Sequence, residues 1–298
     1  MYSLYGINNL IMRYSGLDNS FYYPFQAEHG WYGRNAILPT DYNKKRGVNL
    51  VVNKRRKNIW GLAGVPNVEI IGPPLSLYIK LNPQILDRKK EGVIYLAPHS
   101  TKQIDVNYSV NKICESLREL HNNFSPVTIM LHYFDRNLAP LYELNGFKSV
   151  TAGNIYSNSF PGKFFEILSS YEYCASSHFG THALHAFDLG IPFFTIPLEG
   201  VVYRGNDKNT DSTGEVRFLQ DSVNLVELFQ GPLIKNSLEQ KLFFIDESSH
   251  GHIISSEELR EKILYSREGE LSSFSGIGPT CLGVASSINS TIKFLTYK

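Results

Sequence analysis

From residue 93 onward the chain alternates short apolar runs with segments of helical periodicity, and this alternation limits the folds open to it. The apolar runs lie at 93–98, 127–131, 149–151, 173–175 and 193–196. Helices are expected between them at about 106–122, 138–144, 161–171 and 179–189. Strands that alternate with helices in this way form a parallel sheet with helices on both faces. The sequence therefore predicts an α/β fold with a doubly wound, Rossmann-like parallel sheet.

A shorter α/β portion precedes this region. Its expected elements are a helix at 4–14, strands at 21–26, 49–52 and 68–72, and a helix at 54–62. Proline and charged residues cluster at 73–92, which is typical of a connection between structural units. We therefore expect an N-terminal portion at 1–80 and a larger domain at 81–298, the latter ending in a helical segment. Within that segment, the Ser-Ser-Glu-Glu run at 255–258 indicates a helix start, and 281–297 is expected to form a closing helix.

The composition narrows the cellular setting and the partners. Of 298 residues, 42% are hydrophobic and 19% charged, which is enough apolar material for a substantial core. The net charge of +1 argues against a general nucleic-acid binder. Cys114, Cys174 and Cys281 have no metal-ligand spacing, which favours a reducing compartment. With no signal-peptide pattern and no long apolar run, we expect a cytoplasmic protein whose membrane contact, if any, is peripheral.

Small polar residues follow two of the expected strands. The first strand leads into His99, Ser100, Thr101 and Lys102. The fourth leads into Ser176 and Ser177, and then into Gly180 and Thr181 at the start of a helix. The carboxyl ends of parallel strands face the ligand crevice, and hydroxyls and free amides at a helix N-terminus bind phosphate. These eight residues are therefore predicted to bind the phosphate of a nucleotide ligand.

The N-terminal portion offers a candidate for proton transfer. Glu28, His29 and Gly30 follow an expected strand, and Trp31 and Tyr32 come directly after them. A carboxylate or an imidazole can act as a general base, and the sequence does not decide between Glu28 and His29. Trp31 and Tyr32 are predicted to stack on a sugar or to contact an acceptor.

Two further features are candidates for binding. Glu199 ends the last regular strand and is expected to accept hydrogen bonds from a ribose or a base edge. Between Lys44 and Lys57 lie seven basic residues: Lys44, Lys45, Arg46, Lys54, Arg55, Arg56 and Lys57. Such a cluster suits an anionic lipid headgroup or an acidic glycan, so it is the predicted site of any peripheral inner-membrane contact.

Missing motifs exclude several classes of enzyme. The sequence has no G-x-x-x-x-G-K-[ST] loop and no G-x-G-x-x-G fingerprint, which argues against ATP hydrolysis and classical NAD binding. It has no G-x-S-x-G elbow and no Asp-x-Asp pair of the kind that holds the metal in many sugar transferases. We therefore expect chemistry with neither a cofactor nor a metal ion.

In their order along the chain, Glu28-His29-Gly30, His99-Ser100 and Ser176-Ser177 resemble the three short motifs of bacterial GT-B glycosyltransferases that use CMP-linked acidic sugars. Sialyltransferases and Kdo transferases are of this kind. The stretch 176–197 also resembles the donor-binding region of capsule and lipopolysaccharide glycosyltransferases. The resemblance covers about residues 20–200. It implies a GT-B-like fold, a base in the first motif and contacts with the nucleotide phosphate in the other two.

The resemblance thus implies a metal-independent, inverting glycosyltransferase of surface-polysaccharide biosynthesis. Its donor would be a CMP- or UDP-linked nucleotide sugar, and its acceptor an oligosaccharide or lipid-linked glycan. Two alternatives remain open. One is a nucleotide-sugar epimerase or hydrolase of the same architecture, and the other is a non-catalytic subunit that binds a glycan or a nucleotide.

Overall fold

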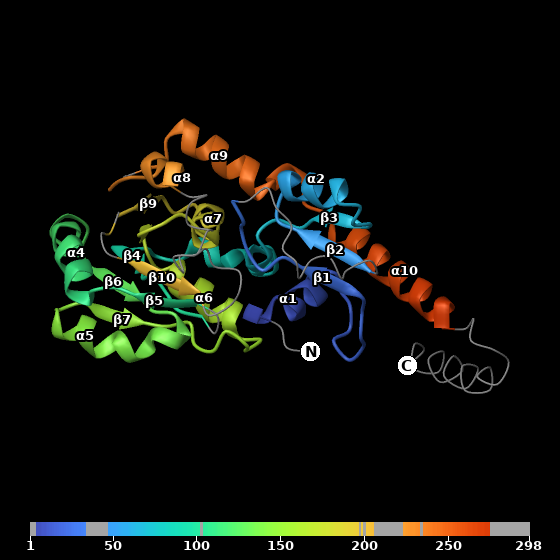
Figure 1. Ribbon diagram of the computed structural model, residues 1–298, viewed down its shortest axis with the longest axis horizontal. Helices are drawn as coiled ribbons and strands as arrows, with labels where there is room; N and C mark the ends of the chain where they lie inside the picture. The colour runs from blue at the N-terminus through green and yellow to red at the C-terminus, as the bar shows by residue number, and fades with distance from the viewer. Residues whose placement is uncertain are drawn as a thin grey trace.

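The computed structural model describes residues 4–33, 47–101, 104–196, 198, 201–205, 223–232 and 235–274. Within them the chain forms two α/β units that lie side by side, each built on its own parallel sheet (Figure 1). The expected α/β class with parallel sheets is confirmed. The predicted closing helix at 281–297 lies outside the described residues.

The larger unit contains a five-stranded, fully parallel sheet. Its strand order is β7-β6-β4-β8-β9. In chain order the strands are β4 (Val93–Leu96), β6 (Val127–Met130), β7 (Lys148–Val150), β8 (Tyr173–Ser176) and β9 (Phe193–Thr195). The first strand therefore lies in the middle, and the chain winds outward in one direction before reversing. This is the doubly wound order that the sequence predicts, with its switch point between β4 and β8.

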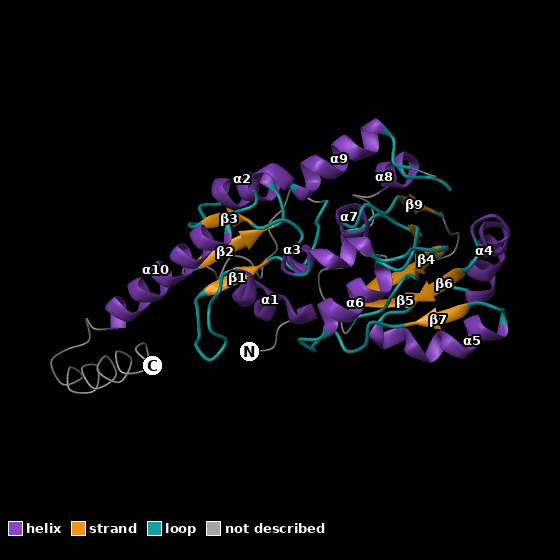
Figure 2. Cartoon of the chain, turned by 180° about the vertical axis from the view of Figure 1, so that it is seen from behind, coloured by secondary structure: helices purple, strands orange, loops and turns teal. Residues whose placement is uncertain are grey.

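Helices, purple in Figure 2, lie on both faces of this sheet, whose strands are orange. One face packs against α4 (Val110–Phe124) and α5 (Ala139–Leu144), with Tyr95, Leu117 and Tyr142 buried between them. The other face packs against α6 (Phe160–Leu168) and α7 (Thr181–Asp188). Because both faces are covered, β4, β6, β8 and β9 are mostly apolar rather than alternating, which is the pattern expected of a buried parallel sheet, whereas the edge strand β7 is not buried.

The smaller unit has a three-stranded parallel sheet in the order β1-β2-β3. Its strands are β1 (Phe25–Ala27), β2 (Val48–Val51) and β3 (Val68–Ile70). The helix α1 (Ile7–Tyr14) follows the short η1 (Leu4–Gly6), and α2 (Lys54–Leu62) connects β2 to β3. Asn53 caps α2 by accepting a hydrogen bond from the Arg56 amide at 2.9 Å. The connection to the larger unit runs through η3 (Pro74–Ser76), α3 (Leu77–Leu81) and η4 (Pro83–Asp87).

After β9 the chain returns to the smaller unit. It passes through α8 (Val223–Leu228), α9 (Leu238–Ser248) and η7 (His250–His252) to α10 (Ser256–Phe274). The Ile254 amide donates to the Ile70 carbonyl at 2.9 Å, and Lys262 on α10 pairs with Glu69 on β3 at 2.7 Å. The last described helix thus packs against the first sheet, as Figure 1 shows. The helix-start signal at 255–258 is confirmed.

Two sequence-based boundaries are wrong. The first strand covers Phe25–Ala27 rather than 21–26, because Pro24 lacks the amide that a ladder needs. The helix expected from 106 begins at Val110, after the Ser109 cap. Residues before it form β5 (Ile104–Asn107), which pairs antiparallel with β10 (Val202–Gly205). This pairing joins segments almost a hundred residues apart, and local periodicity carries no signal for it.

Candidate active site

The two predicted phosphate-binding segments meet at the switch point of the larger sheet. β4 and β8 are hydrogen-bonded neighbours, with Leu96 opposite Ser176. The segments that follow them, 97–101 and 177–181, therefore leave the sheet side by side at its carboxyl edge. This is where a doubly wound sheet binds its ligand, because the chain diverges to opposite faces there and leaves a crevice.

The two serines after β8 have different environments. Ser176 is buried, and its hydroxyl donates to the Leu96 carbonyl at 3.0 Å, so it ties β8 to β4. Ser177 is half-buried, and its hydroxyl lies 3.2 Å from Nδ1 of His178. Gly180 and Thr181 begin α7 as the sequence indicates. Of the pair, Ser177 is the one placed beyond the end of the sheet.

An imidazole pair lies at the ends of β4 and β6. The ring of His99 packs against that of His132 with centroids 4.5 Å apart. Burial lowers the pKa of His99, while the Asp135 carboxylate offsets part of that shift. Burial, and then the charge of His99, lower the pKa of His132 to about 3. Both rings are therefore neutral near pH 7, and a neutral imidazole supplies one donor and one acceptor.

A second imidazole pair precedes and opens α7. His178 and His182 have ring centroids 5.4 Å apart, and Nε2 of His182 lies 3.2 Å from the His178 carbonyl. Burial lowers the pKa of His182 to about 3, and the pKa of His178 falls well below its ordinary value for the same reason. Each is also depressed by the charge of His99, which places all three in one electrostatic neighbourhood.

The loop after β4 is anchored from β6. The Ser100 amide donates to Oδ2 of Asp135 at 2.7 Å, and the Ser100 hydroxyl accepts from the Val106 amide at 3.2 Å. Asp135 is buried, so this charge-assisted bond fixes the loop strongly. Ser100 therefore holds the His99 loop in place, and Thr101 follows it in the same loop. The next predicted residue, Lys102, lies outside the described part of the chain, as does Glu199.

The smaller unit extends a loop over the start of α7. The Trp31 amide donates to Oγ1 of Thr181 at 2.8 Å, and the Trp31 ring packs edge-on to Phe179 at 5.0 Å. A Cβ at Gly30 would lie 2.4 Å from the same Thr181 oxygen, so only glycine permits this approach. The first and third motifs thus meet in space, although they are 150 residues apart in the chain.

His29 is oriented by Tyr32 in the same loop. The Tyr32 hydroxyl lies 2.9 Å from Nδ1 of His29. The backbone carbonyl of Tyr32 accepts a hydrogen bond from the Arg55 guanidinium at 2.6 Å, and that of Gly33 accepts another at 3.1 Å. When the His29 proton is on Nδ1, Nε2 keeps its lone pair and can accept a proton. The loop therefore presents an imidazole in a fixed setting.

Glu28 faces the interior of the smaller unit. Its carboxylate pairs with Arg56 at 2.6 Å and accepts from the Val52 amide at 3.1 Å, and both charged side chains are almost fully buried. A carboxylate held in this way is engaged by its partners, because without it the Arg56 charge would be buried with no counterion. In this arrangement Glu28 supports the loop, whereas the side chain of His29, the other candidate base, is exposed.

Sequence reasoning missed Glu247, which joins the loop to α9. Its carboxylate accepts from the Trp31 indole at 2.5 Å, from Asn53 at 2.8 Å and from Arg55 at 3.1 Å. No local motif marks this residue, since its partners lie about two hundred residues earlier in the chain. His132 and Asp135 were also missed, although their position directly after an apolar strand is the same signal that marks His99.

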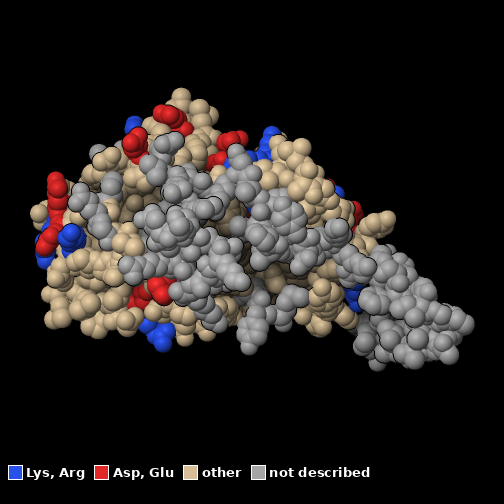
Figure 3. Space-filling model, in the orientation of Figure 1, with Lys and Arg blue, Asp and Glu red and all other residues tan. Residues whose placement is uncertain are grey.

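The described part of the basic cluster is largely neutralised by acidic partners. Arg55 pairs with Glu247, Arg56 with Glu28, and Lys57 with Glu69, which leaves Lys54 exposed. In the view of Figure 3, basic and acidic residues of the described surface lie interspersed. None of the described helices is long and apolar enough to span a bilayer. Among the same residues no group of three or more His, Cys, Asp and Glu is arranged to hold a metal ion.

No protein-family model matches the chain, and no curated protein does. Solved structures similar to it include two of one enzyme. One is the wall teichoic acid polymerase TagF, with 16% identity and a TM-score of 0.43 over 92% of this chain and 69% of that one. The other is a variant of TagF, with 16% identity and a TM-score of 0.39 over 87% and 61%. Similarity at this level does not identify a donor, an acceptor or a mechanism.

Proposed function

We propose that the protein is a metal-independent, inverting glycosyltransferase that uses a nucleotide-sugar donor. What supports this proposal is the convergence of three segments. The loops that contain His99 and Ser177 follow neighbouring strands of the larger sheet, and the loop that contains His29 contacts the start of α7 through Trp31 and Thr181. Donors fixed at the switch point suit a phosphate, and an imidazole on the adjoining loop suits a hydroxyl acceptor.

In the proposed reaction, Nε2 of His29 takes the proton of an acceptor hydroxyl, and the oxygen attacks the anomeric carbon of the donor. The bond between that carbon and the phosphate oxygen breaks, and the nucleotide leaves with the electron pair. His99, Ser177 and the first amides of α7 would stabilise the charge that develops on the leaving phosphate. These donors are neutral and held in fixed positions. No charged group among them therefore has to lose its hydration when the nucleotide sugar binds.

Binding of the donor is tested first by thermal shift with CMP- and UDP-linked sugars. We expect one nucleotide class to raise the melting temperature of the wild-type protein, and His99→Ala to abolish the shift while the variant stays folded. If no nucleotide sugar stabilises the protein, the proposal is wrong.

The base is tested by turnover of the stabilising donor. We expect His29→Ala to lose turnover about 100-fold or more while it keeps donor binding, in line with the usual contribution of a general base. Release of free sugar at full rate without any acceptor would instead favour a hydrolase. Unchanged donor binding with no turnover in the wild type would favour a binding subunit.

A further inference from the structure

A cavity of about 360 Å³ lies on the smaller unit, away from the residues of the candidate active site. Its walls come from three places in the chain: the helix α1, the loop 19–25 that leads into β1, and Asn158 just before α6. The volume falls within the range of pockets that hold small organic ligands. Nothing in the proposed reaction uses this cavity.

The lining of the cavity has an unusual composition. It combines four asparagine side chains with four aromatic rings, and no charged residue lines it among those that the structure describes. The carboxamides of Asn9, Asn19 and Asn158 make no hydrogen bond to another described residue. Each amide offers two donors and an acceptor at one tip. Met12 and Tyr23 are buried beneath them.

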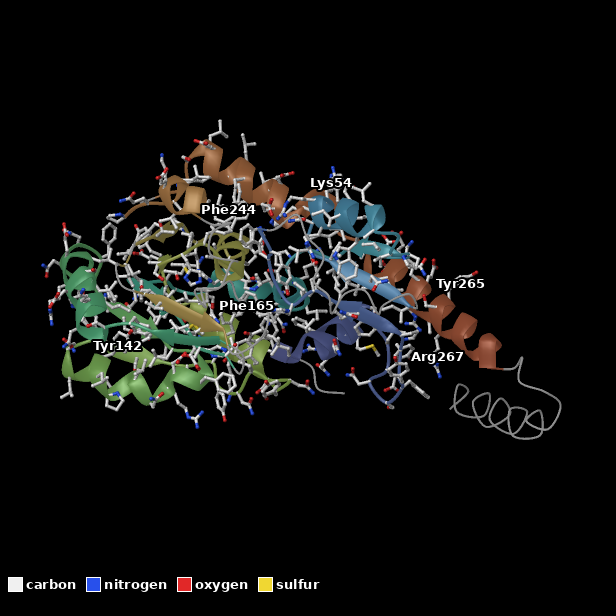
Figure 4. The ribbon with its side chains drawn as sticks, viewed as in Figure 1. Lys54, Tyr142, Phe165, Phe244, Tyr265 and Arg267 are labelled. Atoms are coloured by element: carbon white, nitrogen blue, oxygen red, sulfur yellow. The ribbon has the colours of Figure 1, made fainter. Side chains whose placement is uncertain are left out.

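Contacts from neighbouring elements hold the wall of the cavity in place. The guanidinium of Arg267 on α10 lies 5.1 Å from the Phe21 ring centre and 5.2 Å from that of Tyr23. Asp18 accepts hydrogen bonds from both the amide and the hydroxyl of Ser20. Figure 4 labels Arg267 and Tyr265 on α10, the helix from which this support comes. The Arg267 guanidinium contacts these two rings and is not part of the cavity lining.

The two units come together at the edge of this cavity. Gly6, with φ of +68°, caps α1, and a Cβ there would lie 3.1 Å from Pro161 and 3.2 Å from the Asn158 backbone. Glycine thus lets the first turn of α1 approach the loop before α6 closely. The ring of Tyr5 lies 5.1 Å from Phe160 and 6.5 Å from His29. A single aromatic side chain therefore separates this edge from the loop with the candidate base.

We infer that this cavity binds a neutral oligosaccharide. Carboxamides recognise hydroxyl pairs because they donate and accept at the same time, and aromatic faces cover the apolar C–H surface of a sugar ring. The lack of charged lining residues in the described structure disfavours a nucleotide, a phosphate or an acidic sugar. The role of this ligand rests on the proposed function: it is the acceptor glycan, bound here at a distance from its reacting end.

The test uses the full chain on a printed array of neutral and acidic bacterial glycans, followed by calorimetry on the neutral glycans that bind. We expect Tyr22→Ala and Asn19→Ala to weaken this binding at least 10-fold. Both residues are exposed, so folding is not at stake. Tyr265→Ala and Asn122→Ala remove an exposed tyrosine and an exposed asparagine elsewhere, and these controls should leave binding unchanged.

Binding of no neutral glycan, binding of acidic glycans alone, or equal affinities in all four variants would overturn the inference. A parallel thermal shift with nucleotide sugars separates this outcome from failure of the proposed function. If glycans bind and no nucleotide sugar does, the cavity is a glycan site and the transferase proposal falls. If the nucleotide sugar binds and no neutral glycan does, the transferase proposal stands and the acceptor site is lost.

Discussion

The two units of the molecule differ in how their titratable side chains are arranged. The larger one gathers imidazoles that burial keeps neutral, at the carboxyl ends of its strands. The smaller one gathers charges in pairs, among which Glu28–Arg56 is buried and Arg55–Glu247 fixes a loop. Neutral donors suit the binding of an anion that comes and goes, whereas paired charges suit the permanent placement of a loop. The larger unit thus carries the predicted phosphate donors, whereas the ion pairs of the smaller unit hold the loop with the candidate base in place.

The sharpest way to break this comparison is Arg56→Leu. It leaves the Glu28 carboxylate buried without its counterion, and we expect a loss of about 3–5 kcal/mol in the free energy of unfolding. Denaturant titration measures it. Lys57, which is partly exposed and shares Glu69 with Lys262, is the matched control, since Lys57→Leu should cost less than about 1 kcal/mol. The double variant Glu28→Leu/Arg56→Leu should recover most of the loss, and a double variant as unstable as Arg56→Leu would refute the argument.

Gly30→Ala tests whether the two units must touch. The new methyl would clash with Oγ1 of Thr181 and push the His29 loop away from α7. Since a displacement of about 1 Å can reduce turnover 100-fold, we expect a loss of about that size with the stabilising donor. Gly61→Ala is the control, because nothing lies within 4 Å of a Cβ there. Full turnover in Gly30→Ala would show that the contact is dispensable.

The two units also differ in how much of their structure can be predicted from the sequence. The doubly wound class and the placement of His99 and Ser177 at one edge of the sheet follow from periodicity, because parallel strands end at one edge. The roles of Glu28 and Glu247 do not follow, since they depend on partners brought from other elements. The β5–β10 pairing and the return of α10 are likewise non-local. Periodicity reports which face of an element is buried, but not what lies against it.

The pH dependence of stability tests whether burial keeps the imidazoles of the larger unit neutral. Burial lowers the pKa of His185 to about 3. Between that value and its ordinary pKa near 6.5, the unfolded chain binds a proton that the folded chain rejects, so stability falls as the pH falls. Replacement by His185→Asn should reduce the slope by about 1.4 kcal/mol per pH unit between pH 6 and 4. Thr128→Ser, a buried change without a titrating group, should shift the curve without altering its slope.

The smallest expected effect has the opposite sign. His250 pairs with Asp188 at 2.8 Å, and a hydrogen bond to that carboxylate raises the pKa of His250. Its contribution is present below the ordinary histidine pKa and is lost as the pH rises through the raised value. Because the ring is 44% exposed, His250→Gln should cost no more than about 0.5 kcal/mol at pH 6 and nothing at pH 8. An equal loss of stability at both pH values would show that the ion pair does not contribute to it.

The return of the chain to its first sheet has a consequence for synthesis on the ribosome. Ile254, Leu259 and Ile263 complete the same buried cluster as Leu10 and Leu50. Residues 7–50 must therefore wait for residues 254–263 before this cluster is complete. The ladders of the larger sheet join β4, β6, β7, β8 and β9 alone, so the pairing of these strands needs no segment after residue 195. During translation these five strands are free to pair before the smaller sheet has its complete core.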